Sequence, residues 1–261
     1  MFLLGHSEIR NEAGALVASI GEGLRPLGLD ASRVSAEGAL PALTLLHCDL
    51  AGAVFRSGHR AALAVGPLEP GFFARRAEVA CASARFEELE FAGSVALDDA
   101  VFSYGRDAAG NPVLALEKCG AGVLDISIAR GEVEKLVLSL AQKAAEEQGA
   151  EVKSVSVFWE SRSARTLELR VVARAKAMFM ETSVTATGRV EVTDALALVV
   201  SGLSCSGDGM IGNLAATFLR KEIPKYEGRS ISLAGAFGGL RLWDVSLRCE
   251  AECMTVRAMV G

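Results

Sequence analysis

Two stretches of alternating apolar and polar residues, at 167–179 and 184–192, constrain the fold of this chain more than any other feature. Apolar side chains occupy the odd positions of the first stretch and the even positions of the second. A two-residue period is typical of a β-strand with one buried and one solvated face. The change of parity requires a bulge or a turn between Met180 and Ser183. We therefore expect a long, curved antiparallel sheet with an apolar concave face.

Three other segments have apolar residues at helical spacing. One helix is expected over Ile9–Leu24, a second over Val133–Ala144 and a third over about Met210–Glu222. The apolar stripe of the second helix, with Leu136 and Leu140, is expected to face the concave sheet and to be largely buried.

Turn residues divide the rest of the chain into further strands. Gly66–Gly71 is the strongest breaker of regular structure, and Gly105–Pro112 is predicted to be a turn between two strands. The strands follow one another without alternating with helices, so the chain is predicted to be α+β with antiparallel connections. We expect a single domain over residues 1–261, with an N-terminal half at 7–120 and a C-terminal half at 121–261.

Composition and charge argue against several classes of protein. The formal net charge is −5 and the 27 Lys and Arg residues are scattered, which argues against nucleic acid as a partner. The longest apolar runs fall short of the roughly 20 residues that span a bilayer. The first residues have no basic region of the kind that begins a signal peptide. We therefore expect a cytoplasmic protein.

Neither a metal nor another cofactor is expected. The three histidines, at positions 6, 47 and 59, do not have the spacing of metal ligands. His47, beside Cys48 in an apolar stretch, is interpreted as a histidine of the core. The six cysteines contain no C-x-x-C pair and are interpreted as reduced thiols of the core.

The segment Gly202–Gly207 imitates a hydrolase nucleophile elbow but fails its pattern. G-x-S-x-G requires glycine two residues after the serine, and Ser206 stands there. No histidine follows to complete the order of a catalytic triad. We therefore expect Ser204 to lie in a polar loop and the protein not to be an enzyme.

The order of these patterns resembles a known family. From Glu78 to Leu140 two strands lead into "GVLDISIARGEVEKLV", and from Ala186 to Leu247 the chain contains "TGRVEV" and "LRLWDVSL". These runs are similar to an uncharacterised bacterial family that includes the cell-envelope lipomannan elongation regulator. The resemblance implies a tubular lipid-binding (TULIP) fold, in which a long curved antiparallel sheet wraps amphipathic helices around an apolar channel. It identifies no functional residues to transfer to this chain.

The sequence thus leads to a hypothesis of binding without catalysis. The expected ligand is a lipid or other hydrophobic small molecule, held in an apolar groove or tunnel. The alternative is a structural or protein–protein interaction module in which the same residues form a packed core. Peripheral contact with a membrane and a homodimer both remain open. The residues expected to line the groove are Leu136, Leu140, Leu167, Leu169, Val171, Ala173, Ala175, Phe179, Leu214 and Phe218.

Overall fold

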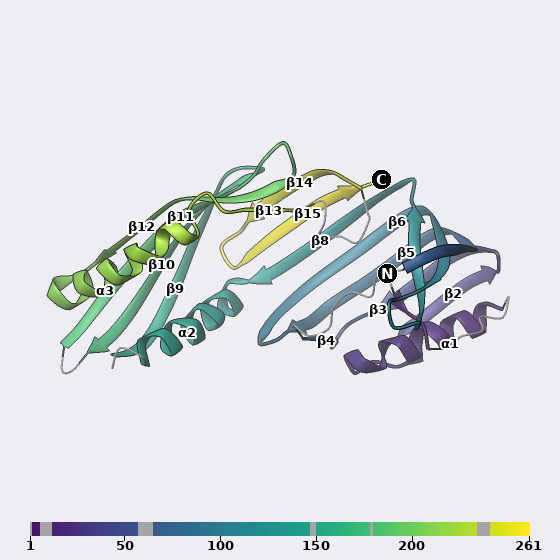
Figure 1. Cartoon of the computed structure of the whole chain (residues 1–261), viewed down its shortest axis with the longest axis horizontal. Coiled ribbons are helices and arrows are strands. Elements are labelled where there is room, and N and C mark those ends of the chain that lie inside the picture. Colours follow the sequence, from purple (N-terminus) through teal and green to yellow (C-terminus); the bar gives the residue numbers. More distant parts are fainter. Residues whose placement is uncertain (1, 6–11, 57–64, 147–149, 178–179, 234–240) are drawn as a thin grey trace. The chain divides into compact units, whose positions relative to one another are not determined.

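The computed structural model describes residues 2–5, 12–56, 65–146, 150–177, 180–233 and 241–261. The chain divides into two compact units, coloured along the sequence in Figure 1. Unit 1 comprises Met1–Ser127, Ala234–Asp244 and Arg257–Gly261, and unit 2 comprises Ile128–Leu233 and Val245–Val256. Sheets with a few helices make up both units, so the predicted α+β class is confirmed. The single domain stays a prediction. Within the described ranges, no helix is both long and apolar enough to cross a membrane.

Unit 1 contains long strands and, among its described residues, one α-helix. The strands β8 (Ala121–Ala129), β14 (Leu242–Cys249) and β15 (Cys253–Val260) have residues in both units. The other elements are β1 (Phe2–Leu3), α1 (Ala13–Leu24), the 3-10 turns η1 (Arg25–Leu27) and η2 (Ala31–Arg33), β2 (Val34–Ala39), β3 (Ala42–Asp49), β4 (Val54–Phe55), β5 (Val65–Phe86), β6 (Leu89–Arg106) and β7 (Pro112–Lys118).

The large sheet of the chain is mixed rather than antiparallel throughout. Its order is β14-β15-β8-β6-β5-β3-β2, with β7 also paired to β6, β1 to β7 and β4 to β5. The pairs β3–β5 and β4–β5 are parallel. The predicted antiparallel connections hold for β2–β3, β5–β6, β6–β7 and β6–β8, and the two parallel pairs were not predicted. A parallel pair needs a crossover of a dozen or more residues, and the segment 50–64 supplies one between β3 and β5.

The breaker at Gly66–Gly71 does not end a strand but lies within β5. The register of β5 against β6 shifts between Val65 and Glu69 and again between Pro70 and Phe72. Prolines are tolerated in strands at such irregularities. A Cβ on Gly71 would overlap the carbonyl of Phe102, so glycine permits the close approach of the two strands. The predicted turn after β6 is confirmed, because β6 ends at Arg106 and β7 begins at Pro112.

Helix α1 contributes three deeply buried residues to the core of unit 1. Leu16, Ile20 and Leu24 recur at every fourth position and are 0 %, 2 % and 3 % exposed. The predicted end of this helix at Leu24 is confirmed, and its predicted start at Ile9 lies outside the described residues.

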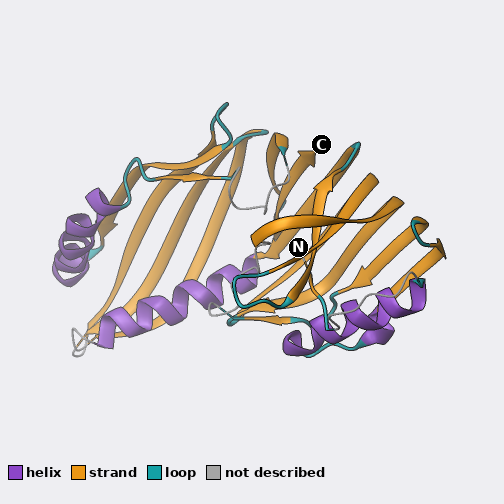
Figure 2. Ribbon diagram, turned by 45° about the vertical axis from the view of Figure 1, so that its right-hand side comes forward, coloured by secondary structure: helices purple, strands orange, loops and turns teal. Residues whose placement is uncertain are grey.

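Unit 2 is an antiparallel sheet with two helices. Its elements are α2 (Arg130–Glu146), β9 (Ala150–Ser163), β10 (Thr166–Ala177), β11 (Met180–Val192), β12 (Ala197–Gly207), α3 (Gly209–Glu222), the 3-10 turn η3 (Ile223–Lys225) and β13 (Ser230–Ser232). The strand order is β13-β12-β11-β10-β9, and Figure 2 shows the helices along its two sides. The predicted turn between Met180 and Ser183 was placed too late, because β11 begins at Met180, which pairs with Ala177.

Candidate functional site: an apolar groove between two helices

The register of β10 against β11 brings the two apolar sets of the sequence onto one face of the sheet. The odd positions of β10 stand opposite the even positions of β11. Adjacent side chains of a strand point to opposite faces, so the change of parity at the hairpin keeps the apolar positions together. The pairs on this face, which we call the helix face, are Leu169↔Gly188, Val171↔Ala186 and Ala173↔Val184.

Helix α2 packs on the helix face above the edge strand β9. Val152, Val155 and Val157 of β9 are buried against a stripe of the helix made of Val133, Val137, Leu138, Ala141 and Ala145. Two side chains of α2 bond to the free edge of β9. The backbone N–H of Val157 donates to Glu134 Oε1 at 2.8 Å, and Gln142 Nε2 donates to the carbonyl of Val152 at 3.2 Å. The flank of α2 that carries Glu134 and Gln142 therefore faces the outside of the sheet.

Leu136 and Leu140 lie on the opposite flank of α2. On a helical wheel they lie beside Val133 and Val137, between the packed stripe and the solvent side of the helix. They are 36 % and 58 % exposed. The prediction that both are largely buried was wrong. Helix α2 has more apolar residues than one face can bury, and the stripe through Val137 and Ala141 takes the contact with β9.

Helix α3 covers the other side of the same face. Ala216 is fully buried against Val184 of β11 and Cys205 of β12. Arg220 Nε donates to the carbonyl of Cys205 at 2.9 Å. The N–H of Asp208 donates to the carbonyl of Ser183, and hydrogen-bonded and non-hydrogen-bonded pairs alternate along an antiparallel ladder. The pair Ala186↔Cys205 is therefore not hydrogen-bonded, and the carbonyl of Cys205 points away from β11.

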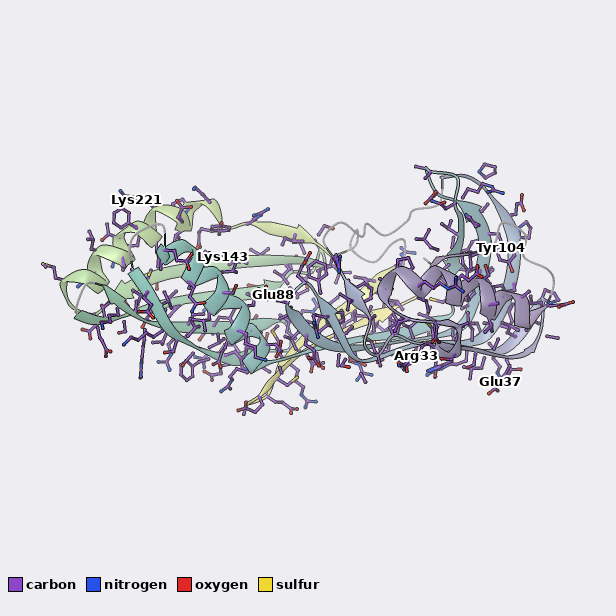
Figure 3. The ribbon with its side chains drawn as sticks, turned by 90° about the horizontal axis from the view of Figure 1, so that it is seen from below. Arg33, Glu37, Glu88, Tyr104, Lys143 and Lys221 are labelled. Carbon is purple, nitrogen blue, oxygen red and sulfur yellow. The ribbon has the colours of Figure 1, made fainter. Side chains whose placement is uncertain are left out.

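Leu214 and Phe218 lie on the flank of α3 opposite Arg220. Each lies two positions from the buried Ala216, so at 3.6 residues per turn both are on the side of α3 that is turned away from the sheet. They are 60 % and 52 % exposed. Figure 3 labels Lys143 on α2 and Lys221 on α3, the two helices that lie on the same side of the sheet.

We call the strip of sheet between α2 and α3 the groove, because the sequence predicts one there; Leu136 and Leu140 lie on the helix along one side of it and Leu214 and Phe218 on the helix along the other. Its floor consists of half-buried, mostly small residues of β10 and β11. Leu167 is only 2 % exposed, so it belongs to the core and offers no lining surface. Phe179 lies outside the described residues. The structure brings to one face the other predicted lining residues, which are Leu136, Leu140, Leu169, Val171, Ala173, Ala175, Leu214 and Phe218.

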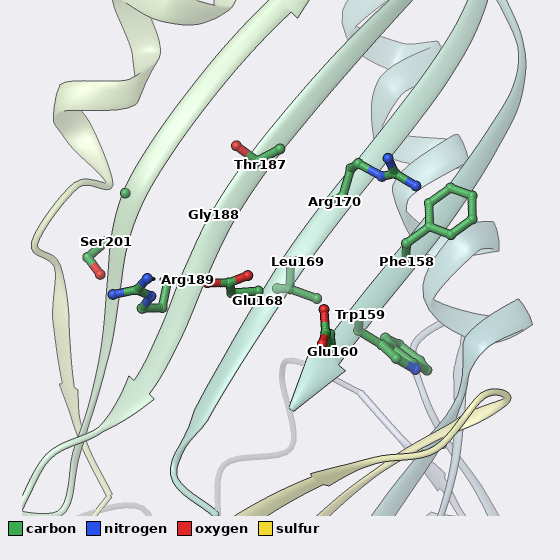
Figure 4. Close-up of a pocket in the computed structure, with 11 residues that line it drawn as sticks. Phe158, Trp159, Glu160, Glu168, Leu169, Arg170, Thr187, Gly188, Arg189 and Ser201 are labelled. Carbon is green, nitrogen blue, oxygen red and sulfur yellow. Dashed lines mark hydrogen bonds and ion pairs between the residues drawn. The ribbon is translucent and has the colours of Figure 1, made fainter. Parts of the chain in front are cut away.

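A polar pocket lies on the other face of the same sheet and was missed by the sequence reasoning. Its volume is about 750 Å³. Its side chains come from four adjacent strands, as Figure 4 shows. The available signal was the run of charges at even positions of β10, but their partners depend on the pairing of distant strands. The pocket is lined by Phe158, Trp159, Glu160, Glu168, Arg170, Thr187, Arg189, Ser201 and Gly202, and it also borders Leu169 and Gly188, whose Cβ positions belong to the helix face.

Ion pairs neutralise the carboxylates of this pocket. Glu168 lies 2.8 Å from Arg162 and 3.2 Å from Arg189. Hydrogen bonds from Arg162 and then Arg189 hold the pKa of Glu168 below its ordinary value. The carboxylate is therefore ionised at neutral pH and is a poor proton donor. Arg170 stacks on Phe158, 4.6 Å from the ring centroid, so the pocket has the character of a solvated, charge-balanced sheet surface.

Ser204 lies in strand β12, so the prediction of a polar loop at this position was wrong. Its side chain is 2.7 Å from the hydroxyl of Thr187 on β11. A hydroxyl that faces another hydroxyl has no general base to activate it.

The thiols and histidine of the described chain also differ in part from expectation. All six cysteines are free, as predicted, but only Cys48, Cys81 and Cys205 are buried, so the prediction that all six are core thiols was wrong. Burial, with a smaller effect of Asp49, raises the pKa of the Cys48 thiol to about 12, so it stays protonated. His47 is not a core residue: its side chain is one-third exposed, with Nδ1 3.6 Å from Glu78. No group of three or more His, Cys, Asp or Glu side chains suited to a metal ion occurs among the described residues.

Comparison of the chain with known protein families, with curated proteins and with solved structures finds no match.

The two flanks of α2 should respond differently to truncation. We expect Val137→Ala to lower the free energy of unfolding by about 1–2 kcal/mol, because it opens a cavity above β9. Leu140→Ala should lower it by about 0.5 kcal/mol or less, because this side chain is mostly exposed. Urea denaturation followed by circular dichroism measures both values. Equal losses in the two variants would show that Leu140 is buried after all.

Proposed function

We propose that unit 2 binds the hydrocarbon chain of a lipid or similar molecule in the groove between α2 and α3. The observation that carries this proposal is the presence of four exposed apolar side chains on the two helices that border one apolar sheet face. Leu136 and Leu140 come from α2, and Leu214 and Phe218 from α3. Contiguous exposed apolar side chains and apolar clefts are typical of ligand-binding and interaction sites.

The floor of the groove is suited to a chain rather than to a bulky polar ligand. Ala173 and Ala175 of β10 and Ala186 of β11 have small side chains, which leave room for a methylene chain above the sheet, whereas the side chain of Leu203 covers Gly188. Burial of apolar ligand surface contributes about 25 cal/mol per Å². The TULIP-like arrangement implied by the resemblance remains part of this proposal, and the placement of both helices on one sheet face supports it.

The proposal includes no catalytic step. The groove is lined by hydrocarbon side chains, which provide no acid, base or oxyanion donor. The alternative of an interaction module with a fully packed core is less well supported, because the four flank residues are 36–60 % exposed.

A tryptophan on the groove floor should block binding of the chain. We expect Ala175→Trp to abolish binding of a fluorescent long-chain fatty acid, because the indole would occupy the space above β10. The matched control is Val172→Trp, on the other face of the same strand, which should bind normally. Fluorescence titration measures binding, and thermal unfolding shows whether each variant is folded.

Three results would count against the groove. One is normal fatty-acid binding by a folded Ala175→Trp variant, and another is equal loss of binding in the Val172→Trp control. The third concerns the wild-type protein, whose organic extract we expect to contain lipid. If the extract contains no lipid and the protein does not bind the fatty acid, the proposal is refuted.

A further inference from the structure

Helices α2 and α3 carry the same pattern of side chains on the sides that are not packed on the sheet. In each, an apolar residue is followed four positions later by a second and three positions after that by a lysine. Residues at this spacing share one side of a helix. The two sets are Leu136, Leu140 and Lys143 on α2 and Leu214, Phe218 and Lys221 on α3. Because both helices lie on one sheet face, both sets are presented from the same side of unit 2.

The two lysines of this pattern are not engaged by carboxylates. Among the described residues, Lys143 has no ion-pair partner, and Lys221 contacts only the ring of Phe218, with Nζ 5.3 Å from its centroid. Two other lysines of this region differ: Lys135 is 2.6 Å from Glu132, and Lys225 is 2.6 Å from Glu222. The positive charge of the shared pattern is therefore available to an external anion.

Met210 extends the apolar side of α3 by one turn. It precedes Leu214 by four positions and is 82 % exposed. The side of α3 that faces solvent thus presents three large apolar side chains in a row, next to a lysine. An aqueous environment disfavours such an arrangement unless a partner covers it.

We infer that unit 2 docks on an anionic lipid bilayer through the exposed sides of α2 and α3. Amphipathic helices that lie in a membrane interface place Leu, Phe and Met among the acyl chains and Lys at the headgroups. The unengaged Lys143 and Lys221 complement an anionic surface. This inference goes beyond chain binding, because docking requires contact of the helices with the bilayer but no chain in the groove.

Vesicle sedimentation tests the inference. Wild-type protein should sediment with vesicles of three parts phosphatidylcholine to one part phosphatidylglycerol, and much less with phosphatidylcholine alone. The Lys143→Gln and Lys221→Gln double variant should bind the anionic vesicles about 25-fold more weakly, at about fivefold for each lysine. Met210→Gln should weaken binding about tenfold, because one apolar anchor is lost.

The matched control is the double variant of Lys135→Gln and Lys225→Gln. It changes the net charge by the same amount, but its lysines are paired with glutamates and lie outside the shared pattern, so vesicle binding should change less than twofold. Equal weakening in the two double variants would overturn the inference. So would wild-type protein that sediments equally with both kinds of vesicle, or with neither.

The same variants separate docking from the proposed groove. Met210→Gln should keep wild-type affinity for the fluorescent fatty acid, whereas Ala175→Trp should keep vesicle binding. Wild-type protein that binds the fatty acid but does not sediment with vesicles would thus contradict docking and would not affect the proposed groove. A wild-type dimer in analytical ultracentrifugation that dissociates in Met210→Gln would assign this surface to a second copy of the chain and overturn docking.

Discussion

Replacing Gly207 by valine should displace α3 from the sheet of unit 2 and lower the free energy of unfolding by about 3 kcal/mol or more. A Cβ on Gly207 would overlap the carbonyl of Gly212, so the backbones of β12 and α3 are in contact at this point. Neither backbone can give way as a flexible side chain would. Denaturant unfolding measures the loss, and fatty-acid binding should fail with it, because α3 forms one wall of the groove.

Gly131→Val is the matched control for this prediction. Gly131 lies in the first turn of α2, and a Cβ there would meet no atom within 4 Å. This substitution should change the free energy of unfolding by about 0.5 kcal/mol or less, since valine also has a higher helix propensity than glycine. If Gly207→Val were as mild as the control, the close contact between α3 and β12 would not exist.

The residues that form the apolar face of the sheet in unit 2 could be predicted from the sequence, because they follow from the two-residue period of each strand alone. The odd positions of β10 and the even positions of β11 were expected to share one apolar face, and the observed register confirms this through pairs such as Ala173↔Val184. A slip of one residue would expose the whole set. Few local patterns constrain a structure as strongly.

The orientation of α2 could not be predicted, because its apolar residues extend around more than one face. Leu136 and Leu140 form as good a stripe as Val137 and Ala141 in the sequence alone. The choice between them depends on packing against β9 and on the bond from Glu134 to the N–H of Val157, which is 23 positions away. Such long-range contacts have no local signature.

The same limit explains the errors in unit 1. Gly66–Gly71 has the composition of a turn, but β6 pairs with this segment and accommodates its prolines at two register shifts. The parallel pairing of β3 with β5 likewise depends on where the chain returns, which composition does not encode. Local sequence predicts which segments are extended more reliably than which of them become neighbours.

Leu140 and Phe218 are expected to dominate chain binding in the groove, since each is a large, exposed apolar side chain on one of the two helices that border it. Each should contribute about tenfold to the affinity for a fluorescent long-chain fatty acid, through burial of apolar surface on binding. The variants Leu140→Asn and Phe218→Asn should therefore each lose about tenfold, and the double variant about 100-fold. Both side chains are more than half exposed, so thermal stability should change little.

The control for this last prediction is Phe158→Asn. Phe158 lies on β9 of the same sheet and is 41 % exposed, comparable with Phe218, but its side chain belongs to the polar pocket on the other face. If the groove binds the chain, this substitution should leave the affinity unchanged, although it removes as much exposed aromatic surface as Phe218→Asn. Equal losses in the two variants would mean that the fatty acid adheres to apolar surface in general. If only the Leu140 and Phe218 variants lose affinity, the site must lie on the helix face, because these two side chains come from different helices and that face is what the helices have in common.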